Sequence, residues 1–313
     1  MQWTRRSFLG STVAGVWALT AWPGESRPAA RPDFGHLRLA VAVQGGSPEQ
    51  LGEEAKWAKS AGFERVQLSL WMQEPQDEDL QLMHAALEEH GLRAVVFGTY
   101  INPLDPGNSG YMGASQEAMG ALARNAGVFG ANLFVAWSGG YHARFSAGDP
   151  RNATGEAMDA LVSATNDLLA SIDVCAGRLA YEPYYPDILG SPARYAEFFG
   201  RMGATRRVGM VMDPPNFVQP AQYPERTAIM EEAFRLPADR IFVAHLKDIA
   251  PAPDGGIALP GPCDGTMNYD LYLTRLASLG RPIDCVIEHT GGPNLARHHD
   301  AVRRRIDALA ARI

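Results

Sequence analysis

The chain has 313 residues, of which 46% are hydrophobic and 20% are charged, and its formal net charge at pH 7 is −7. This length and this hydrophobic content are enough for one large globular core. The negative net charge argues against a broad nucleic-acid-binding surface, because such a surface needs clustered positive charge to neutralise phosphates. We therefore expect a small-molecule partner and no nucleic acid.

The first thirty residues are predicted to direct export rather than to form part of the fold. The twin-arginine export signal has an arginine pair before a bulky apolar residue, which is similar to residues 4–9 (TRRSFL). A moderately apolar stretch continues to Trp22, shorter than the about 20 residues that a membrane-spanning helix needs. We expect residues 1–30 to be the signal, residues 31–313 to be one domain, and the exported, periplasmic protein not to stay inserted in a membrane.

From residue 37 onward, short apolar runs alternate with amphipathic segments. The short runs are rich in β-branched residues, which is typical of strands buried on both faces of a parallel sheet. The predicted strands are 37–44, 66–70, 93–98, 132–137, 178–182, 208–213, 241–245 and 285–288. The predicted helices are 47–61, 77–90, 115–129, 155–175, 192–203, 224–236, 268–279 and 293–313. This alternation predicts a single (β/α)8 TIM barrel, and no Gly-x-Gly-x-x-Gly motif supports the alternative of an open doubly wound sheet.

Long loops follow several of the predicted strands, whereas most segments before the strands are short. In a TIM barrel, the loops after the strands build the pocket at the C-terminal face. Aromatic side chains on these loops could stack on sugar rings or simply pack the loops against the barrel. These residues are Tyr100, Tyr111, Trp137, Tyr141, Tyr184, Tyr185 and Phe217.

Four of the predicted strands end in a residue of metal-ligand type. These residues are Glu182, Asp213, His245 and Glu288, separated by 31, 32 and 43 positions. Each gap is about one βα unit, so we expect the four side chains at the same end of the barrel. Three carboxylates and one imidazole suit one divalent ion, for which we favour Mn²⁺, with Mg²⁺, Co²⁺ and Zn²⁺ as alternatives.

The same strand ends resemble those of the xylose isomerase-like barrels, specifically the sugar phosphate isomerase/epimerase group. The resemblance covers about residues 37–313 and rests on residues 212–216 (MDPPN), 245–248 (HLKD) and 287–289 (IEH). It implies an enzyme that binds one divalent metal through the residues ending strands five to eight, which here are Glu182, Asp213, His245 and Glu288. Ketose epimerases often carry a second histidine where this chain has Asn216, and they often carry an arginine shortly after the seventh-strand histidine, which is missing here.

This combination of residues predicts acid–base chemistry on a sugar or keto-sugar. Isomerisation or epimerisation through an enediolate needs a base beside the reacting carbon and an acid that returns the proton. Glu182 and Glu288 are the natural pair for these roles. Lys247 is expected to stabilise the oxyanion or to hold a carboxylate, or alternatively to form a surface salt bridge with Asp248. The candidates for substrate contact are Trp137, His142, Tyr184 and Asn216.

Two other functions fit the same pattern. One is a metal-dependent carbon–oxygen lyase, either a dehydratase or a glycoside-eliminating enzyme, acting on a keto-sugar or cyclitol. The other is a non-catalytic exported carbohydrate-binding barrel, and in each case the sequence leaves the oligomeric state open. Among the other histidines, His289 would point to the opposite side of its strand from Glu288 if the chain stays extended there, and a role in supporting a ligand is as plausible as none. Five histidines are expected to be solvated: His36, His84, His90, His298 and His299.

Overall fold

The structure, a computed structural model, describes residues 31–72, 74–105, 114–141 and 148–313. The predicted export signal, residues 1–30, lies outside the described residues, and export stays a prediction. His142 and Tyr111 also lie outside them, so their contacts with a substrate stay predictions as well. Within the described ranges, no helix is both long enough and apolar enough to cross a membrane.

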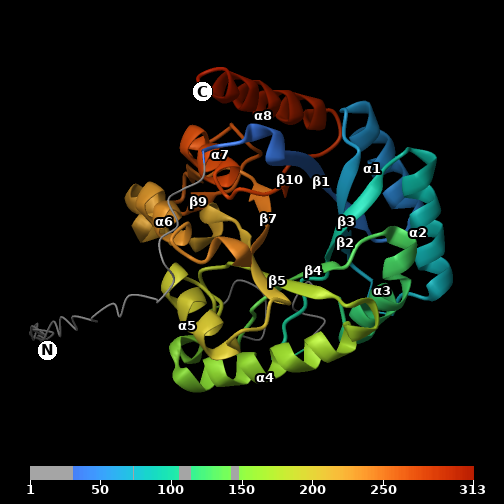
Figure 1. The fold of residues 1–313 in the computed structure, drawn as a ribbon, viewed down its shortest axis with the longest axis horizontal. Helices are drawn as coiled ribbons and strands as arrows, with labels where there is room; N and C mark the ends of the chain where they lie inside the picture. The colour runs from blue at the N-terminus through green and yellow to red at the C-terminus, as the bar shows by residue number, and fades with distance from the viewer. Residues whose placement is uncertain (1–30, 73, 106–113, 142–147) are drawn as a thin grey trace, which may run out of the picture.

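The described chain forms a closed parallel barrel surrounded by helices, which confirms the predicted (β/α)8 TIM barrel (Figure 1). The barrel strands are β1 (Leu37–Gly45), β2 (Arg65–Leu70), β3 (Arg93–Gly98), β4 (Leu133–Trp137), β5 (Arg178–Glu182), β6 (Val208–Met212), β7 (Ile241–Leu246) and β10 (Ile283–Ile287). The helices are α1 (Pro48–Ser60), α2 (Asp77–Glu89), α3 (Gln116–Phe129), α4 (Gly155–Ser171), α5 (Pro192–Met202), α6 (Arg226–Ala233), α7 (Tyr269–Ala277) and α8 (Asn294–Ala310). Pairing of β1 with β10, with Leu37 opposite Ile283, closes the barrel.

Helix α5 illustrates how the local sequence sets these elements. Ser191 accepts a hydrogen bond from the Arg194 amide as the N-cap, and proline occupies the first helical position, where its missing N–H removes no bond. Three aromatic residues, Tyr195, Phe198 and Phe199, then share one face and are buried against the barrel. Burying each of them contributes roughly 1.5–3 kcal/mol, so packing rather than helix propensity holds this helix in place.

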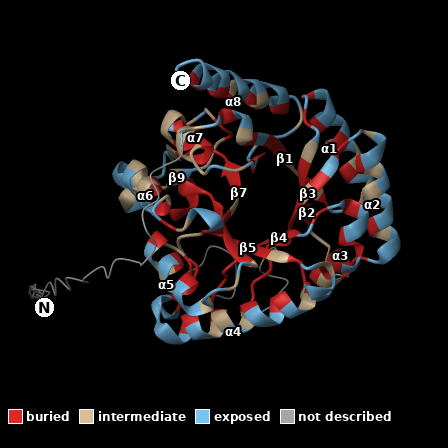
Figure 2. Ribbon diagram, viewed as in Figure 1, coloured by how far each residue is buried: buried red, intermediate tan, exposed pale blue. Residues whose placement is uncertain are grey.

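The core has two layers. The larger cluster lies between the strands and the helices, and a smaller one fills the barrel interior. Figure 2 shows the consequence, because the strands are buried while the outward faces of the helices are exposed. The interior cluster consists of Ala40, Val96, Tyr100, Leu133, Val135, Trp137, Ala180, Val211, Val243 and Val286.

Two segments differ from the sequence-based expectation. The loop after β7 contains a short antiparallel hairpin, β8 (Ala250–Pro251) and β9 (Ile257–Ala258), which was predicted as irregular chain. Its turn depends on Gly255, whose φ of 82° lies in the left-handed region. The helix predicted from residue 224 begins only at Arg226, because the prolines of the preceding segment, Pro220–Glu225, favour a 3₁₀ turn there.

Candidate metal centre and cavity

Three carboxylates and one imidazole meet at the C-terminal end of the barrel. Glu182 ends β5, His245 lies in β7, and Asp213 and Glu288 directly follow β6 and β10. All four are candidate metal ligands, and one ligand atom from each lies within 4.8 Å of the others. The structure therefore brings together the four side chains whose strand-end positions suggested a metal site.

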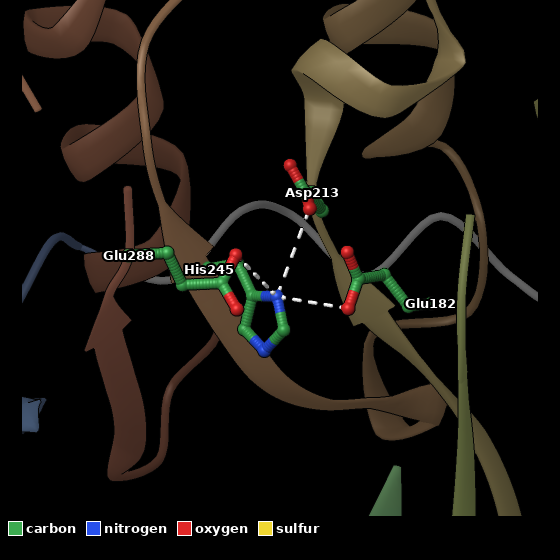
Figure 3. Close-up of side chains that lie close together, drawn as sticks. All are labelled: Glu182, Asp213, His245 and Glu288. Carbon is green, nitrogen blue, oxygen red and sulfur yellow. Dashed lines mark ion pairs between the residues drawn. The ribbon is translucent and has the colours of Figure 1, made fainter. Parts of the chain in front are cut away.

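The histidine lies at the middle of this cluster (Figure 3). Its Nδ1 is 3.1 Å from Glu288 Oε2, 3.2 Å from Glu182 Oε2 and 3.6 Å from Asp213 Oδ2. The imidazole of His245 and the carboxylate of Asp213 are fully buried, and the other two carboxylates are nearly so. One ring nitrogen thus faces an oxygen of every carboxylate in a site that is almost closed to water.

Lys247 also belongs to the cluster. Its side chain is buried, and Nζ lies 3.0 Å from Glu288 Oε2 and 3.4 Å from Glu182 Oε1, with a further contact to Asp213 Oδ2. The alternative of a surface salt bridge with Asp248 is wrong. Asp248 is itself buried, and its Oδ1 accepts hydrogen bonds from two backbone amides of the loop after β7.

Burial and electrostatic attraction have opposite effects on the pKa values of this centre. Burial disfavours the charged forms, and attraction between opposite charges favours them. Burial raises the pKa of Glu182, since the attraction of Lys247 and His245 compensates only in part. Burial also disfavours the charged forms of Asp213 and Glu288, but Lys247 and His245 outweigh it and lower both pKa values. The pKa values of the two cationic groups are raised, because attraction to the carboxylates exceeds the effect of burial. The cluster is thus a coupled set of opposite charges.

The unsatisfied atoms of the centre show that a metal fits it. Glu182 Oε2, Asp213 Oδ1 and His245 Nδ1 are buried and have no hydrogen-bond partner within the part of the chain that the structure describes. Buried polar atoms are normally paired, so three unpaired ones in a single cluster indicate a missing partner. Ligands on opposite sides of a divalent ion lie about 4 Å apart, close to the spread of these atoms. Glu182, Asp213, His245 and Glu288 would hold such an ion.

Gln67 of β2 sets the orientation of the histidine from the opposite side of the barrel. Its Oε1 lies 3.1 Å from His245 Nε2, and its Nε2 donates to Tyr100 Oη at 2.8 Å. Because an amide oxygen can only accept, His245 carries a hydrogen on Nε2 in this contact. Nδ1 is therefore the nitrogen available to a metal, which would replace the hydrogen that Nδ1 directs at the carboxylates in the protonated ring.

We expect the substitution Gln67→Met to weaken metal binding by about 10- to 100-fold, because the histidine loses the acceptor that fixes its tautomer and ring orientation. Titration with Mn²⁺, followed by electron paramagnetic resonance of the free ion, measures this loss. Gln67→Glu is the matched control, since it retains an acceptor for His245 Nε2 and should bind Mn²⁺ more tightly than Gln67→Met. Equal affinity of Gln67→Met and wild type would contradict the role of Gln67.

Tyrosine hydroxyls hold the strand ends that carry these ligands. Tyr272 Oη donates to the carbonyls of Met212 and His245 at 2.6 and 3.0 Å, and Tyr269 Oη donates to the Lys247 carbonyl at 3.0 Å. From α5, the hydroxyl of Tyr195 reaches the carbonyl before Glu182 at 2.8 Å. At the end of a sheet these carbonyls need partners from outside the sheet. The buried tyrosines therefore position the ligand-bearing backbone.

A cavity of about 350 Å³ opens onto the centre. One part of its lining is a row of aromatic rings. Trp71 is stacked on Tyr100 with ring centroids 5.4 Å apart, and the ring centroids of Trp137 and Tyr100 are 4.9 Å apart. Three of the four predicted substrate-contact residues, Trp137, Tyr184 and Asn216, line this cavity. Asn216 also donates to Glu182 Oε1 at 2.7 Å, so it positions a candidate ligand.

The profile of the xylose isomerase-like TIM barrel family matches residues 55–311. The chain belongs to the xylose isomerase-like TIM barrel family. This confirms the resemblance at the level of the family, whereas the sugar phosphate isomerase/epimerase group within it stays a prediction. A search of curated protein sequences finds no match.

Solved structures with this fold include proteins of several kinds. A xylose isomerase-like TIM barrel protein from Mycobacterium smegmatis, in complex with magnesium, has 16% sequence identity and a TM-score of 0.65, with 87% of this chain and 96% of that chain covered. A D-tagatose 3-epimerase-like protein has 12% identity and a TM-score of 0.65, with 88% and 99% covered. Mannonate dehydratase from Streptococcus suis serotype 2 has 14% identity and a TM-score of 0.61, with 88% and 95% covered. At these identities the likeness shows the fold alone.

Other side chains of this xylose isomerase-like barrel do not follow the sequence-based expectations. His298 was expected to be solvated, but it is buried and contacts Thr290 and Asp264. His298 lies three residues after Leu295 and four before Val302, so it falls on the buried face of α8, where it packs against the loop that carries Asp264. Phe217, in contrast, agrees with one of the two expectations for the loop aromatics, because it packs against Tyr195.

Sequence reasoning did not find several residues of the cavity. Each of the four ligands is a ligand-type residue at the end of an apolar run. None of these cavity residues combines that residue type with that position. For the two that follow Glu288, their place directly after a ligand was the available signal. These residues are Gln44, Ser69, Trp71, His289 and Thr290.

Proposed function

We propose that the protein is a divalent-metal-dependent isomerase or epimerase that acts on a sugar or keto-sugar. The observation that carries this proposal is the set of buried ligand atoms of Glu182, Asp213 and His245 that make no hydrogen bond with the described residues, at the base of a cavity. Glu288 completes the set. A site that is built only for stability would not leave these atoms without partners.

The chain supplies an acid–base pair beside the proposed ion. Glu182 and Glu288 come from β5 and from the end of β10, and both line the cavity. One would remove the proton next to the carbonyl, and the other would return a proton to the other face or to the neighbouring carbon. A bound divalent ion would supply Lewis-acid stabilisation of the negative charge that develops in the enediolate.

Neighbouring side chains would orient this pair. Asn216 donates to Glu182, and the Tyr100 hydroxyl lies 3.4 Å from Glu288 Oε1. Lys247 contacts both glutamates, so its ammonium group would hold their carboxylates in position and stabilise an oxyanion that develops beside them. Of the proposed ions we favour Mn²⁺, since this mixed oxygen and nitrogen ligand set suits it, with Mg²⁺, Co²⁺ and Zn²⁺ as alternatives.

The aromatic row supports a carbohydrate as the substrate. Trp71, Tyr100 and Trp137 present apolar surface beside polar groups, which is the combination that the faces and hydroxyls of a sugar require. The D-tagatose 3-epimerase-like protein and the mannonate dehydratase share the fold. The likeness to mannonate dehydratase favours a carbon–oxygen lyase as the alternative reaction. Elimination would use the same base and the same metal centre.

The test combines metal analysis with isotope exchange. We expect one divalent ion per chain in wild type and a loss of the ion in His245→Ala, whereas the control His84→Ala, on α2, should remain loaded. A panel of aldoses, ketoses and keto-sugars is then incubated in deuterium oxide with the loaded protein. Deuterium next to the carbonyl of a recovered isomer supports isomerisation, and an unsaturated product supports elimination.

Three results would contradict the proposal in different ways. A fully loaded His245→Ala protein would remove the metal assignment. Metal binding without exchange or turnover of any sugar would favour the non-catalytic binding barrel. Exchange that proceeds equally well after removal of the ion would show that the centre is not the reaction site.

A further inference from the structure

The chain turns sharply directly after β10. A continuing strand would point His289 away from the side that Glu288 faces. Instead His289 has a φ of 53°, in the left-handed region, and both His289 and Thr290 line the cavity together with Glu288. The chain is therefore not extended at His289, and the orientation expected for an extended strand does not apply. Non-glycine residues rarely adopt this conformation, and it persists where the surroundings hold it.

His289 is held by the loop that follows β7. Its Nδ1 lies 2.6 Å from the carbonyl oxygen of Leu259. Because a carbonyl oxygen can only accept, Nδ1 carries the hydrogen in this bond. In the neutral ring, Nε2 then has a lone pair and acts as a hydrogen-bond acceptor.

Thr290 is held from α8. Its Oγ1 lies 2.5 Å from Nδ1 of the buried His298, whose Nε2 is 2.9 Å from Asp264 Oδ2. Arg297 binds both oxygens of Asp264 at 2.6 Å, and its Nη2 also lies 2.8 Å from His298 Nε2. The carboxylate is the stronger acceptor for both groups, so His298 donates from Nε2 and accepts the Thr290 hydroxyl hydrogen at Nδ1. The Thr290 oxygen keeps its lone pairs for other donors.

The loop behind His298 is closely packed against α8. A Cβ at Gly261 would lie 2.3 Å from Cε1 of His298, so only glycine leaves room for the ring at this point. The loop that carries Gly261 and Asp264 is thereby fitted against α8. Thr290 consequently has a fixed orientation at the cavity.

We infer that His289 and Thr290 form a hydroxyl-binding subsite for the uncharged part of a sugar, beyond the atoms held at the proposed metal centre. This inference rests on the proposed function and narrows its substrate class. Two adjacent acceptors suit the O–H donors of a polyol. They lie beside Glu288, and no arginine is among the described residues that line the cavity. Lys247 also lines it, but its ammonium group is paired with three carboxylates, so a phosphate at the subsite would meet no unpaired cation among the described residues.

The test measures binding rather than turnover. Trp71 and Trp137 line the cavity, so tryptophan fluorescence reports a ligand in it. We expect wild type with saturating Mg²⁺ to bind D-fructose roughly tenfold or more tightly than D-fructose 6-phosphate. Thr290→Val and His289→Phe should each weaken D-fructose binding by about two- to tenfold, the effect of one hydrogen bond. Thr290→Ser and His289→Gln, which restore an acceptor, should recover most of the affinity.

The outcomes separate this inference from the proposed function. Affinity for Mg²⁺ should be the same in all four variants, which shows that the centre is intact. If wild type binds neither these two compounds nor any sugar of the deuterium-exchange panel, the proposed function fails and the inference fails with it. If wild type binds D-fructose but prefers the 6-phosphate, or if Thr290→Val or His289→Phe binds D-fructose as tightly as wild type, the inference alone is overturned.

Discussion

Glu182→Gln and Glu288→Gln are each expected to lower turnover by roughly 10²–10⁴-fold, the usual contribution of a positioned acid or base. Glutamine keeps the size of the side chain and one oxygen that can face an ion. It removes the basic carboxylate, so proton transfer at the reacting carbon loses its acceptor or its donor. The measurement is the rate at which the hydrogen next to the substrate's carbonyl exchanges with solvent deuterium.

Each of these substitutions alters a candidate ligand as well as a candidate base. The assays therefore need saturating metal, with occupancy measured in every sample. Glu231→Gln is the matched control, because Glu231 is bound to Arg275 outside the cavity and should exchange hydrogen at the wild-type rate. If both fully loaded variants exchange at the wild-type rate, neither glutamate is the base, and Lys247 becomes the next candidate.

Lys247→Met is expected to destabilise the metal-free protein by about 3–5 kcal/mol. Lys247 contacts all three carboxylates of the centre from a buried position, so its loss leaves buried negative charge without its main partner. A divalent ion bound at the same carboxylates would supply the missing positive charge. Saturating Mn²⁺ should therefore restore much of the lost free energy of unfolding.

Urea unfolding with and without a chelator measures this effect. Lys59→Met, on the exposed side of α1, is the matched control and should change the free energy of unfolding by no more than about 0.5 kcal/mol. Wild-type stability of Lys247→Met in the presence of chelator would show that the carboxylates do not depend on Lys247. A loss of stability that Mn²⁺ does not reverse would show that the lysine and the ion do not share the same carboxylates.

The architecture and the four candidate ligands could be predicted from the sequence, because both depend on local patterns. Eight apolar runs alternating with amphipathic segments indicate a closed parallel barrel. The carboxyl ends of its strands all lie at one face. A ligand-type residue at the end of an apolar run is therefore placed at that face by chain connectivity alone. Glu182, Asp213, His245 and Glu288 meet for this reason, although they are spread over more than 100 residues.

The partners of those ligands were decided only by the tertiary structure. Gln67 reaches His245 across 178 residues of sequence, because closure of the barrel places β2 and β7 on facing sides of one interior. Whether Lys247 pairs with a surface neighbour or with buried carboxylates depends on whether the chain stays extended after His245, so that both side chains point the same way, and residue type does not determine this. His289 and Thr290 line the cavity because the backbone of His289 is in the left-handed conformation. Contacts with the β7 loop and with α8 stabilise this conformation, which no local sequence pattern indicates.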